Sequence, residues 1–389
     1  MNKKVIALAV AGALASPLAA QAQTANVTMY GTFRLALEST DLKDVGRSNH
    51  IDSWSSRWGV RGIESLGGGL NGIFQMELGF NLDNPGGIVV ESTAPGTNAS
   101  VRYQVVTIRE AWVGLNGGFG TIKMGAGLTP WDDVMGMDHL LLANGFEGMT
   151  TLGAGTNPSI SRSGNFTNFA NAGPTATSNT SGQSCNTSTN YDARYGESIR
   201  YDSPNFAGLT FATDFAFLGE NATGYKCKGW DSAVIYNNGP IEAAVGYSRH
   251  IDFQTYDGNA WVIHGAYNFG VVKLQGQWER MKYDGNNGSV GSGQARYYNI
   301  GVVVPLGPGQ LTAQYHNRNK GVNVTATTIS EVDNGGGKAY SVSYKYGFSK
   351  RTYAYAFGGQ VRADDGARIE GSPLGGRATF VGFGLQHNF

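Results

Sequence analysis

Apolar and polar side chains alternate with a period of two along nearly the whole chain beyond its N-terminal region. In the segment that begins at Asn26, Val27 and Met29 belong to an apolar face, whereas Arg34 belongs to a polar one. The same alternation returns in segment after segment, and helical periodicity is weak and confined to residues 131–143. Such a pattern is typical of β-strands that have one apolar and one polar face.

The chain divides into sixteen such segments, and the connections between them alternate in length. The segments begin near residues 26, 56, 70, 105, 120, 194, 209, 231, 241, 260, 271, 296, 310, 338, 351 and 377. Short connections rich in turn residues alternate with long ones, the longest covering residues 129–193. Antiparallel neighbours joined in this way place all tight turns at one end of a sheet and all long loops at the other. The pattern predicts an all-β, 16-stranded antiparallel transmembrane β-barrel with a long third loop.

Two features favour a barrel in a membrane over a soluble β-sandwich. Segments of about ten residues match the length of a tilted strand that crosses a bilayer. The polar face belongs to nearly every segment, so the enclosed side of the barrel must be wet, whereas a soluble β-protein would bury an apolar face. The final segment ends at Phe389, and we expect this aromatic residue to close the barrel against the first strand.

The N-terminal region has the features of a secretory signal peptide. Lys3 and Lys4 are followed by an apolar core from Val5 to Leu14, and Ala20-Gln21-Ala22 is a small-x-small cleavage site. The core is too short to span a membrane as a helix, and no later stretch has the required apolar length. We therefore expect residues 1–22 to be removed on export and residues 23–389 to form a single barrel domain.

Composition and charge exclude several other classes of protein. Glycine accounts for 58 of 389 residues, and charged residues amount to only 15%. An aromatic content of 11% excludes a disordered chain, and a net charge of zero argues against binding to nucleic acid. The six histidines show no metal-ligand spacing, and neither a nucleophile elbow nor a phosphate-binding loop is present. The sequence therefore predicts no enzyme activity, no cofactor and no metal site.

The chain has two cysteines, Cys185 and Cys227, and both fall in predicted long loops. Export places them in an oxidising compartment, where a disulfide between them is permitted. Such a bond would tie the third loop to the fourth. The alternative is that the two residues are free thiols.

Several runs of residues resemble the general diffusion porins of Gram-negative β-proteobacteria, in the same order along the chain. They are Ser56–Gly62, Leu66–Leu70, Phe74–Glu77, Trp112–Leu115, Phe119–Ile122, Tyr201–Gly208, Asn238–Pro240, Tyr267–Gly270, Phe348–Thr352 and Gly384–Phe389. The resemblance covers essentially the whole chain after the signal peptide. It implies a homotrimer in outer-membrane lipid that forms a water-filled channel for the passive diffusion of ions and small hydrophilic solutes.

In this family the third loop folds back into the barrel and forms a constriction, so the resemblance implies the same for residues 129–193. We expect its acidic side to comprise Glu77, Asp132, Asp133 and Asp138. We expect its basic side to comprise Arg57 and Arg109, with Arg34, Arg61 and Lys123 beside them and a second group of Arg194, Ser198 and Arg200. Facing rows of opposite charge create a transverse field that orients solutes and sets ion preference. The alternative is that these residues are solvated in the lumen without control over conductance.

One departure from the family concerns ion preference. Relatives often have an arginine after the glycine of the fifth strand, whereas this chain has Ala126 after Gly125, which weakens the case for anion selectivity. Three other functions stay open from the residues alone: a substrate-selective channel, a plugged barrel that acts as adhesin or receptor, and an outer-membrane barrel enzyme.

Overall fold

The computed structural model describes most of the predicted barrel. The described residues are 26–53, 56–80, 82, 92–93, 100–101, 106–138, 166–167, 191, 194–217, 227–253, 256–286, 288–324, 327–369 and 374–389. The predicted signal peptide, residues 1–22, and most of the predicted third loop lie outside the described residues. Both therefore stay predictions.

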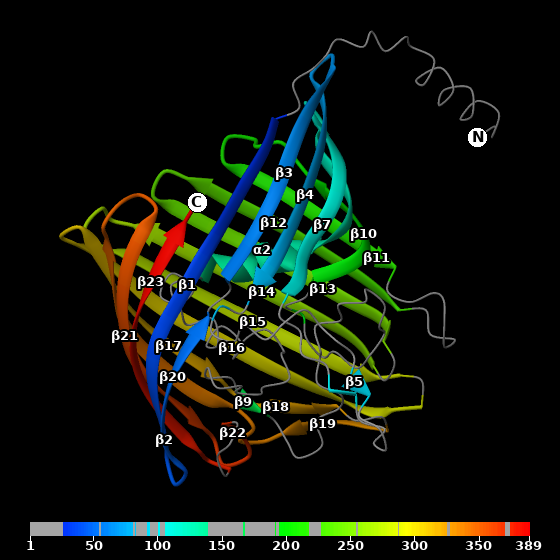
Figure 1. Ribbon diagram of the computed structural model, residues 1–389. Coiled ribbons are helices and arrows are strands. Elements are labelled where there is room, and N and C mark those ends of the chain that lie inside the picture. The colour runs from blue at the N-terminus through cyan, green and yellow to red at the C-terminus, as the bar shows by residue number, and fades with distance from the viewer. Residues whose placement is uncertain are drawn as a thin grey trace.

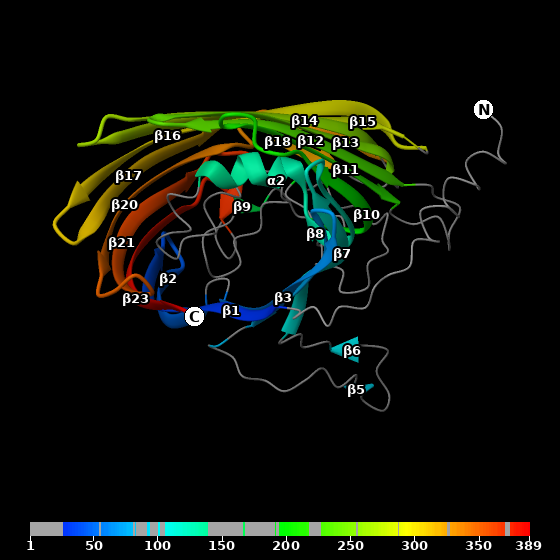
Figure 2. The same ribbon diagram turned by 90° about the horizontal axis from the view of Figure 1, so that it is seen from above.

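Sixteen long strands form a closed antiparallel barrel (Figure 1 and Figure 2). They are β1 (Asn26–Leu42), β3 (Ser56–Gly67), β4 (Leu70–Phe80), β7 (Val106–Gly117), β8 (Gly120–Leu128), β10 (Arg194–Asp202), β11 (Leu209–Phe217), β12 (Lys228–Asn238), β13 (Ile241–Phe253), β14 (Tyr256–Asn268), β15 (Lys273–Gly285), β16 (Val290–Leu306), β17 (Gly309–Arg318), β20 (Gly337–Gly347), β21 (Thr352–Ala363) and β23 (Arg377–Asn388). Each strand pairs with its neighbours in chain order, and β23 pairs with β1, which closes the ring. This architecture confirms the predicted 16-stranded barrel.

The remaining elements are extensions of the main sheet, short strand pairs outside it and helical segments. Three strands extend the main sheet: β2 (Gly46–Ser53), β18 (Gly321–Val324) and β19 (Thr328–Val332). Four short strands form two separate pairs: β5 (Ser92–Thr93) with β6 (Ser100–Val101), and β9 (Phe166–Thr167) with β22 (Arg368–Ile369). The helical elements among the described residues are α2 (Pro130–Met135) and the 3₁₀ turn η1 (Gly136–Asp138).

The first long connection is itself a β-hairpin. β2 pairs antiparallel with the second half of β1, from Leu35 opposite Ser53 to Leu42 opposite Gly46. The pairing prolongs the barrel wall beyond β3 (Figure 1). The alternation pattern misses this strand, because residues 46–53 are almost entirely polar and offer no apolar face. Backbone pairing with β1 therefore holds β2 in place, without an apolar face of its own.

The barrel strands turn apolar side chains outward and polar side chains inward. Along β1, Met29 and Leu37 are 61% and 44% exposed, whereas Arg34 and Glu38 are only 6% and 2% exposed. In β23 the burial alternates from residue to residue over nearly the whole strand. A soluble protein would bury the apolar set. Here the exposed apolar band is suited to contact lipid, and the polar set faces the interior, as the alternation predicted.

Phe389 lies at the seam between the last strand and the first. Its backbone N–H donates to Gly31 O at 3.1 Å, and its carbonyl accepts from Gly31 N at 3.1 Å. Its ring packs against Phe33 with a centroid distance of 5.1 Å. A Cβ at Gly31 would lie 2.3 Å from the Phe389 ring, so only glycine leaves room for the ring at this point.

The segment after β8 turns into the ring and packs on the inner wall (Figure 2). Thr129 caps α2, since its side-chain oxygen accepts from Asp132 N at 3.3 Å. α2 contacts β12, β13 and β14. Trp131 and Val134 are completely buried, and a Cβ at Gly246 of β13 would lie 3.3 Å from Val134 Cγ2. The predicted third loop thus begins inside the barrel, while its further course stays a prediction.

Neither α2 nor any other helix among the described residues is long and apolar enough to cross a membrane.

Candidate functional site

Glu77 of β4 lies between two arginines on the inner face of the barrel. Arg109 Nε donates to Glu77 Oε1 at 2.8 Å, and Arg57 Nε lies 3.6 Å from Glu77 Oε2. Tyr30 OH donates to Glu77 Oε2 at 3.1 Å. The carboxylate side chain is 9% exposed, whereas the side chains of Arg57 and Arg109 are 33% and 20% exposed. These three charged residues form what we call the arginine–glutamate triad, with two positive charges and one negative.

A β-bulge in β7 places two consecutive charged residues on the inner face. β4 and β7 shift register between Glu77 and Leu78, where Arg109 is the additional residue on β7. Arg109 then reaches Glu77, and Glu110 accepts a hydrogen bond from Gln75 Nε2 at 2.8 Å. Strict alternation would turn only one of the two neighbours inward, which is why the sequence pattern misses Glu110.

Two glycines make room for the triad. A Cβ at Gly59 of β3 would lie 2.6 Å from Tyr30 Cζ, so the Tyr30 ring crosses β3 at this position on its way to Glu77. A Cβ at Gly79 of β4 would lie 3.1 Å from Arg109 Cδ. Larger residues at these two positions would displace side chains that hold the Glu77 carboxylate.

A second charged cluster connects the barrel wall to α2. Arg200 of β10 forms an ion pair with Asp133 of α2 and another with Asp202, at 2.7 Å. Its Nη1 donates to Leu128 O at 2.8 Å. Lys123 of β8 lies 3.3 Å from Asp202 Oδ2. Asp133 is therefore paired with a cation of the adjacent wall and is not isolated in the lumen.

The other predicted charged residues have different surroundings. Arg34 is almost fully buried, and its Nε donates across the β1–β23 seam to a glutamine side chain at 3.1 Å. Arg61 stays exposed, with its guanidinium carbon 5.2 Å from the centre of the Tyr30 ring. Asp132 is buried in the first turn of α2, and Asp138 is the last residue of η1. The structure thus brings Arg57, Glu77 and Arg109 into one cluster, whereas Arg34, Arg61 and Asp132 have other surroundings.

Two buried aspartates lie beside α2 and are absent from the predicted site. Asp214 of β11 stands opposite Arg200 in register, and Asp231 of β12 stands opposite Asp214. They are 2% and 0% exposed, and Asp231 lies beside the Thr129 hydroxyl at the start of α2. The sequence did contain a signal, because the residues two positions before and after each aspartate on its strand are glycine or alanine.

Cys227 is fully buried just before β12 and does not carry a free thiol. Cys185, the other cysteine of the chain, lies outside the described residues. The pairing of the two therefore stays a prediction.

Comparison with known proteins assigns this barrel to a family. The family described as "Gram-negative porin" matches residues 7–366 of the chain. The chain belongs to this family. Among curated relatives, the porin is 27% identical to outer membrane porin protein 32 of Delftia acidovorans and 26% identical to major outer membrane protein P.IB of Neisseria meningitidis, over the full length of both partners in each comparison.

Solved porin structures share the fold. The anion-selective porin from Comamonas acidovorans has a TM-score of 0.66 and 22% identity, and the match covers 94% of this porin and 100% of that chain. OmpF of Salmonella typhi has a TM-score of 0.64 and 13% identity, covering 93% and 97%. Membership of the Gram-negative porin family makes this porin an outer-membrane channel for the diffusion of small solutes and not an enzyme. The predictions of family, barrel and outer-membrane location are confirmed.

Proposed function

We propose that this porin is a general, water-filled channel for ions and small hydrophilic solutes, and that Arg57, Glu77 and Arg109 line its narrowest part. The observation that carries the proposal is the position of the triad relative to α2. The triad lies on the inner face of β3, β4 and β7, while α2 packs on β12, β13 and β14, across the ring from β3 (Figure 2). Solutes that cross the barrel would pass between the two.

Opposite charges on the two sides support a transverse field. The cations of the wall from β3 to β10 include Arg57, Arg61, Arg109, Lys123 and Arg200, and the acids include Glu77, Glu110 and Asp202. α2 adds the carboxylates of Asp132 and Asp133. Of these residues the wall carries five cations and three acids, whereas α2 carries acids alone, so the field between the two would orient dipolar solutes.

Unit conductance in planar bilayers tests the proposal most directly. The purified porin should produce stepwise conductance, and liposomes that contain it should swell in small sugars at rates that fall with solute size. A plugged adhesin or receptor would give no conductance steps and no swelling. A channel that admits one organic solute much faster than others of equal size would instead support the substrate-selective alternative.

We also propose that the porin assembles as a homotrimer in outer-membrane lipid. One structural neighbour, OmpT of Vibrio cholerae with a TM-score of 0.57, is described as a trimer form. Exposed apolar side chains such as Phe74, Met76 and Val113 on β4 and β7 offer surface that protein or lipid could cover. Chemical cross-linking in detergent micelles should give three linked chains, and a product limited to single chains would overturn the proposal.

We further propose that residues 1–22 are a signal peptide, which is removed on export. The basic start, the apolar core and the Ala20-Gln21-Ala22 site support this cleavage. Mass spectrometry of the protein isolated from membranes should find Gln23 at the N-terminus. A chain that retains Lys3 and Lys4 would contradict it.

A further inference from the structure

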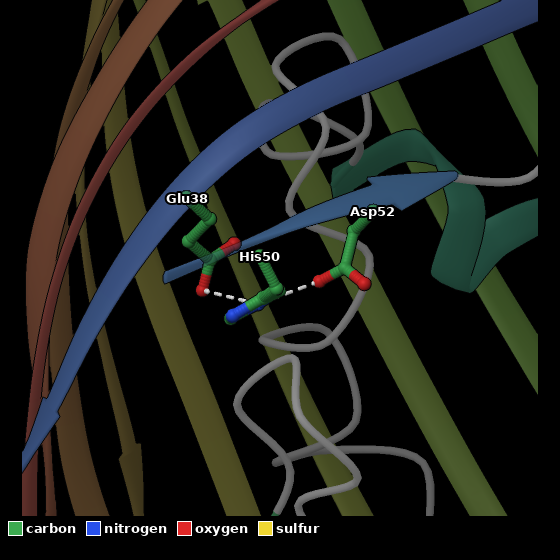
Figure 3. A group of neighbouring side chains, drawn as sticks. All are labelled: Glu38, His50 and Asp52. Carbon is green, nitrogen blue, oxygen red and sulfur yellow. Dashed lines mark ion pairs between the residues drawn. The ribbon is translucent and has the colours of Figure 1, made fainter. Parts of the chain in front are cut away.

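Three metal-binding side chains converge on the inner side of the β1–β2 hairpin, towards the barrel end that carries the long loops. Glu38 belongs to β1, and His50 and Asp52 belong to β2 (Figure 3). His50 Nε2 lies 2.8 Å from Asp52 Oδ2 and 3.8 Å from Glu38 Oε1. One ligand atom of each residue lies within 4.8 Å of the other two, so a single cation could contact all three.

The strand register brings these residues together. Glu38 stands directly opposite His50, and Asp52 stands opposite Ala36. Residues two positions apart on a strand share a face, so His50 and Asp52 point the same way. Ala36 is small and buried, so its side chain adds little bulk beside Asp52 and Glu38, and the His50 ring reaches both. The sequence shows no metal-ligand spacing here, because the ligands meet only through a hairpin that the alternation pattern misses.

Glu38 gives an independent reason to expect a cation. Its side chain is only 2% exposed. Oε1 accepts a hydrogen bond from Thr40 Oγ1 at 2.6 Å, whereas Oε2 has no hydrogen-bond partner among the described residues. Within that part of the chain no lysine or arginine forms an ion pair with it, and the nearest acidic neighbour, Asp52, repels it. His50 is its nearest potentially positive neighbour, at 3.8 Å from Oε1. Since burying a charge with an oxygen left unpaired is costly, a bound cation at Oε2 would stabilise this arrangement.

We propose that Glu38, His50 and Asp52 bind one divalent transition-metal ion. An imidazole nitrogen together with two carboxylate oxygens suits ions such as Zn²⁺, whereas Mg²⁺ and Ca²⁺ prefer ligand sets made entirely of oxygen. Three protein ligands leave a coordination position for water. Zn²⁺ and Co²⁺ are therefore the probes of choice, because Co²⁺ reports its ligand environment through visible d–d absorption.

Metal binding would change both the hairpin and the charge of the barrel entrance. The ion would link β1 to β2 and hold the hairpin against the wall. It would also neutralise the two carboxylates, on the same face as Arg34, which lies four residues before Glu38 on β1. Zn²⁺ should therefore raise the thermal unfolding midpoint and shift the reversal potential towards anions, in a way that depends on the three ligands.

Isothermal titration of chelator-treated, full-length mature porin in detergent tests the proposal. We expect one Zn²⁺ per chain, and we expect His50→Ala to weaken binding by about 100-fold or more, since even second-shell changes cost 10–100-fold. Glu38→Gln and Asp52→Asn should also weaken it, and the Co²⁺ absorption bands should disappear in His50→Ala. His387→Ala, which removes an exposed histidine on the outer face, should bind Zn²⁺ like the wild type.

Absence of saturable Zn²⁺ binding would overturn the proposal, as would equal affinity in wild type, His50→Ala and Asp52→Asn. In that case His50 would serve as the charged partner of two carboxylates, without a metal. If Glu38→Gln fails to fold, His50→Gln and Asp52→Asn carry the test. The outcome is separate from the channel function, because conductance steps without Zn²⁺ binding would reject only the metal site.

Discussion

Two substitutions in the arginine–glutamate triad should change ion preference in opposite directions. The triad has two positive charges and one negative, a net charge of +1. Arg109→Gln lowers this net charge to zero, and Glu77→Gln raises it to +2. Because Arg109 Nε and Glu77 Oε1 are only 2.8 Å apart, both variants alter the potential at the same place. Arg109→Gln should favour cations and Glu77→Gln should favour anions.

The size of the effect follows from Coulomb's law and salt screening. An ion in the pore about 8 Å from the changed charge, one Debye length at physiological ionic strength, interacts with it by about 0.5 kcal/mol in water, which screening reduces to about 0.2 kcal/mol. Cations and anions shift in opposite senses, so their difference changes by about 0.4 kcal/mol, or roughly twofold in permeability ratio. At 1 M salt the Debye length is about 3 Å, and the effect should nearly vanish.

Reversal potentials in a KCl gradient, measured in bilayers at low and at high mean salt, provide the assay. Glu331→Gln is a matched control, since it removes a carboxylate that is paired with Lys320 at 2.7 Å in the β18–β19 hairpin, away from the triad. Shifts of the same sign in both triad variants would refute the reasoning. Shifts that persist at 1 M salt would show that the substitutions act through pore shape and not through charge.

Three further predictions concern α2, the seam and the cysteines. Trp131→Ala removes a fully buried side chain from α2, at a cost of roughly 3–5 kcal/mol; we expect larger and noisier unit conductance, and wild-type current traces would contradict this. Phe389→Ala removes the ring that packs on Phe33 and should slow refolding followed by circular dichroism, whereas an unchanged rate would argue against a role in closure. Cys227→Ser should expose the third loop to protease without lowering the thermal unfolding midpoint, and an unaltered digestion pattern would mean that no bond to Cys185 exists.

The barrel could be predicted from the sequence because lipid and water act on every spanning strand in the same way. Along β23, Val381, Phe383 and Leu385 are 60%, 62% and 59% exposed while the residues between them are buried, so the alternation in the sequence is nearly the alternation in space. β2 could not be found in this manner, since neither of its faces is apolar. Its existence depends on pairing with β1, which is a tertiary contact.

The candidate site was partly accessible to the same reasoning. The alternation of polar and apolar positions, together with the family resemblance, predicted Arg57, Glu77 and Arg109 as residues of the constriction, and the structure places these three side chains together. Glu110 escaped because a bulge breaks the alternation at Arg109. The sequence also did not predict the contact of His50 with Glu38 and Asp52. Backbone pairing sets the register across a hairpin, and the spacing of residues along the chain does not reveal it.

The seam between β1 and β23 has a consequence for biogenesis. Thr32 and Asn388, which are hydrogen-bonded there, stand 356 positions apart in the chain. During translation β1 leaves the ribosome long before β23 exists, so its unpaired edge must be shielded from other chains throughout synthesis and transit. A premature stop codon anywhere upstream of β23 would leave that edge permanently open, and such a product should be a substrate for periplasmic proteases before it can insert.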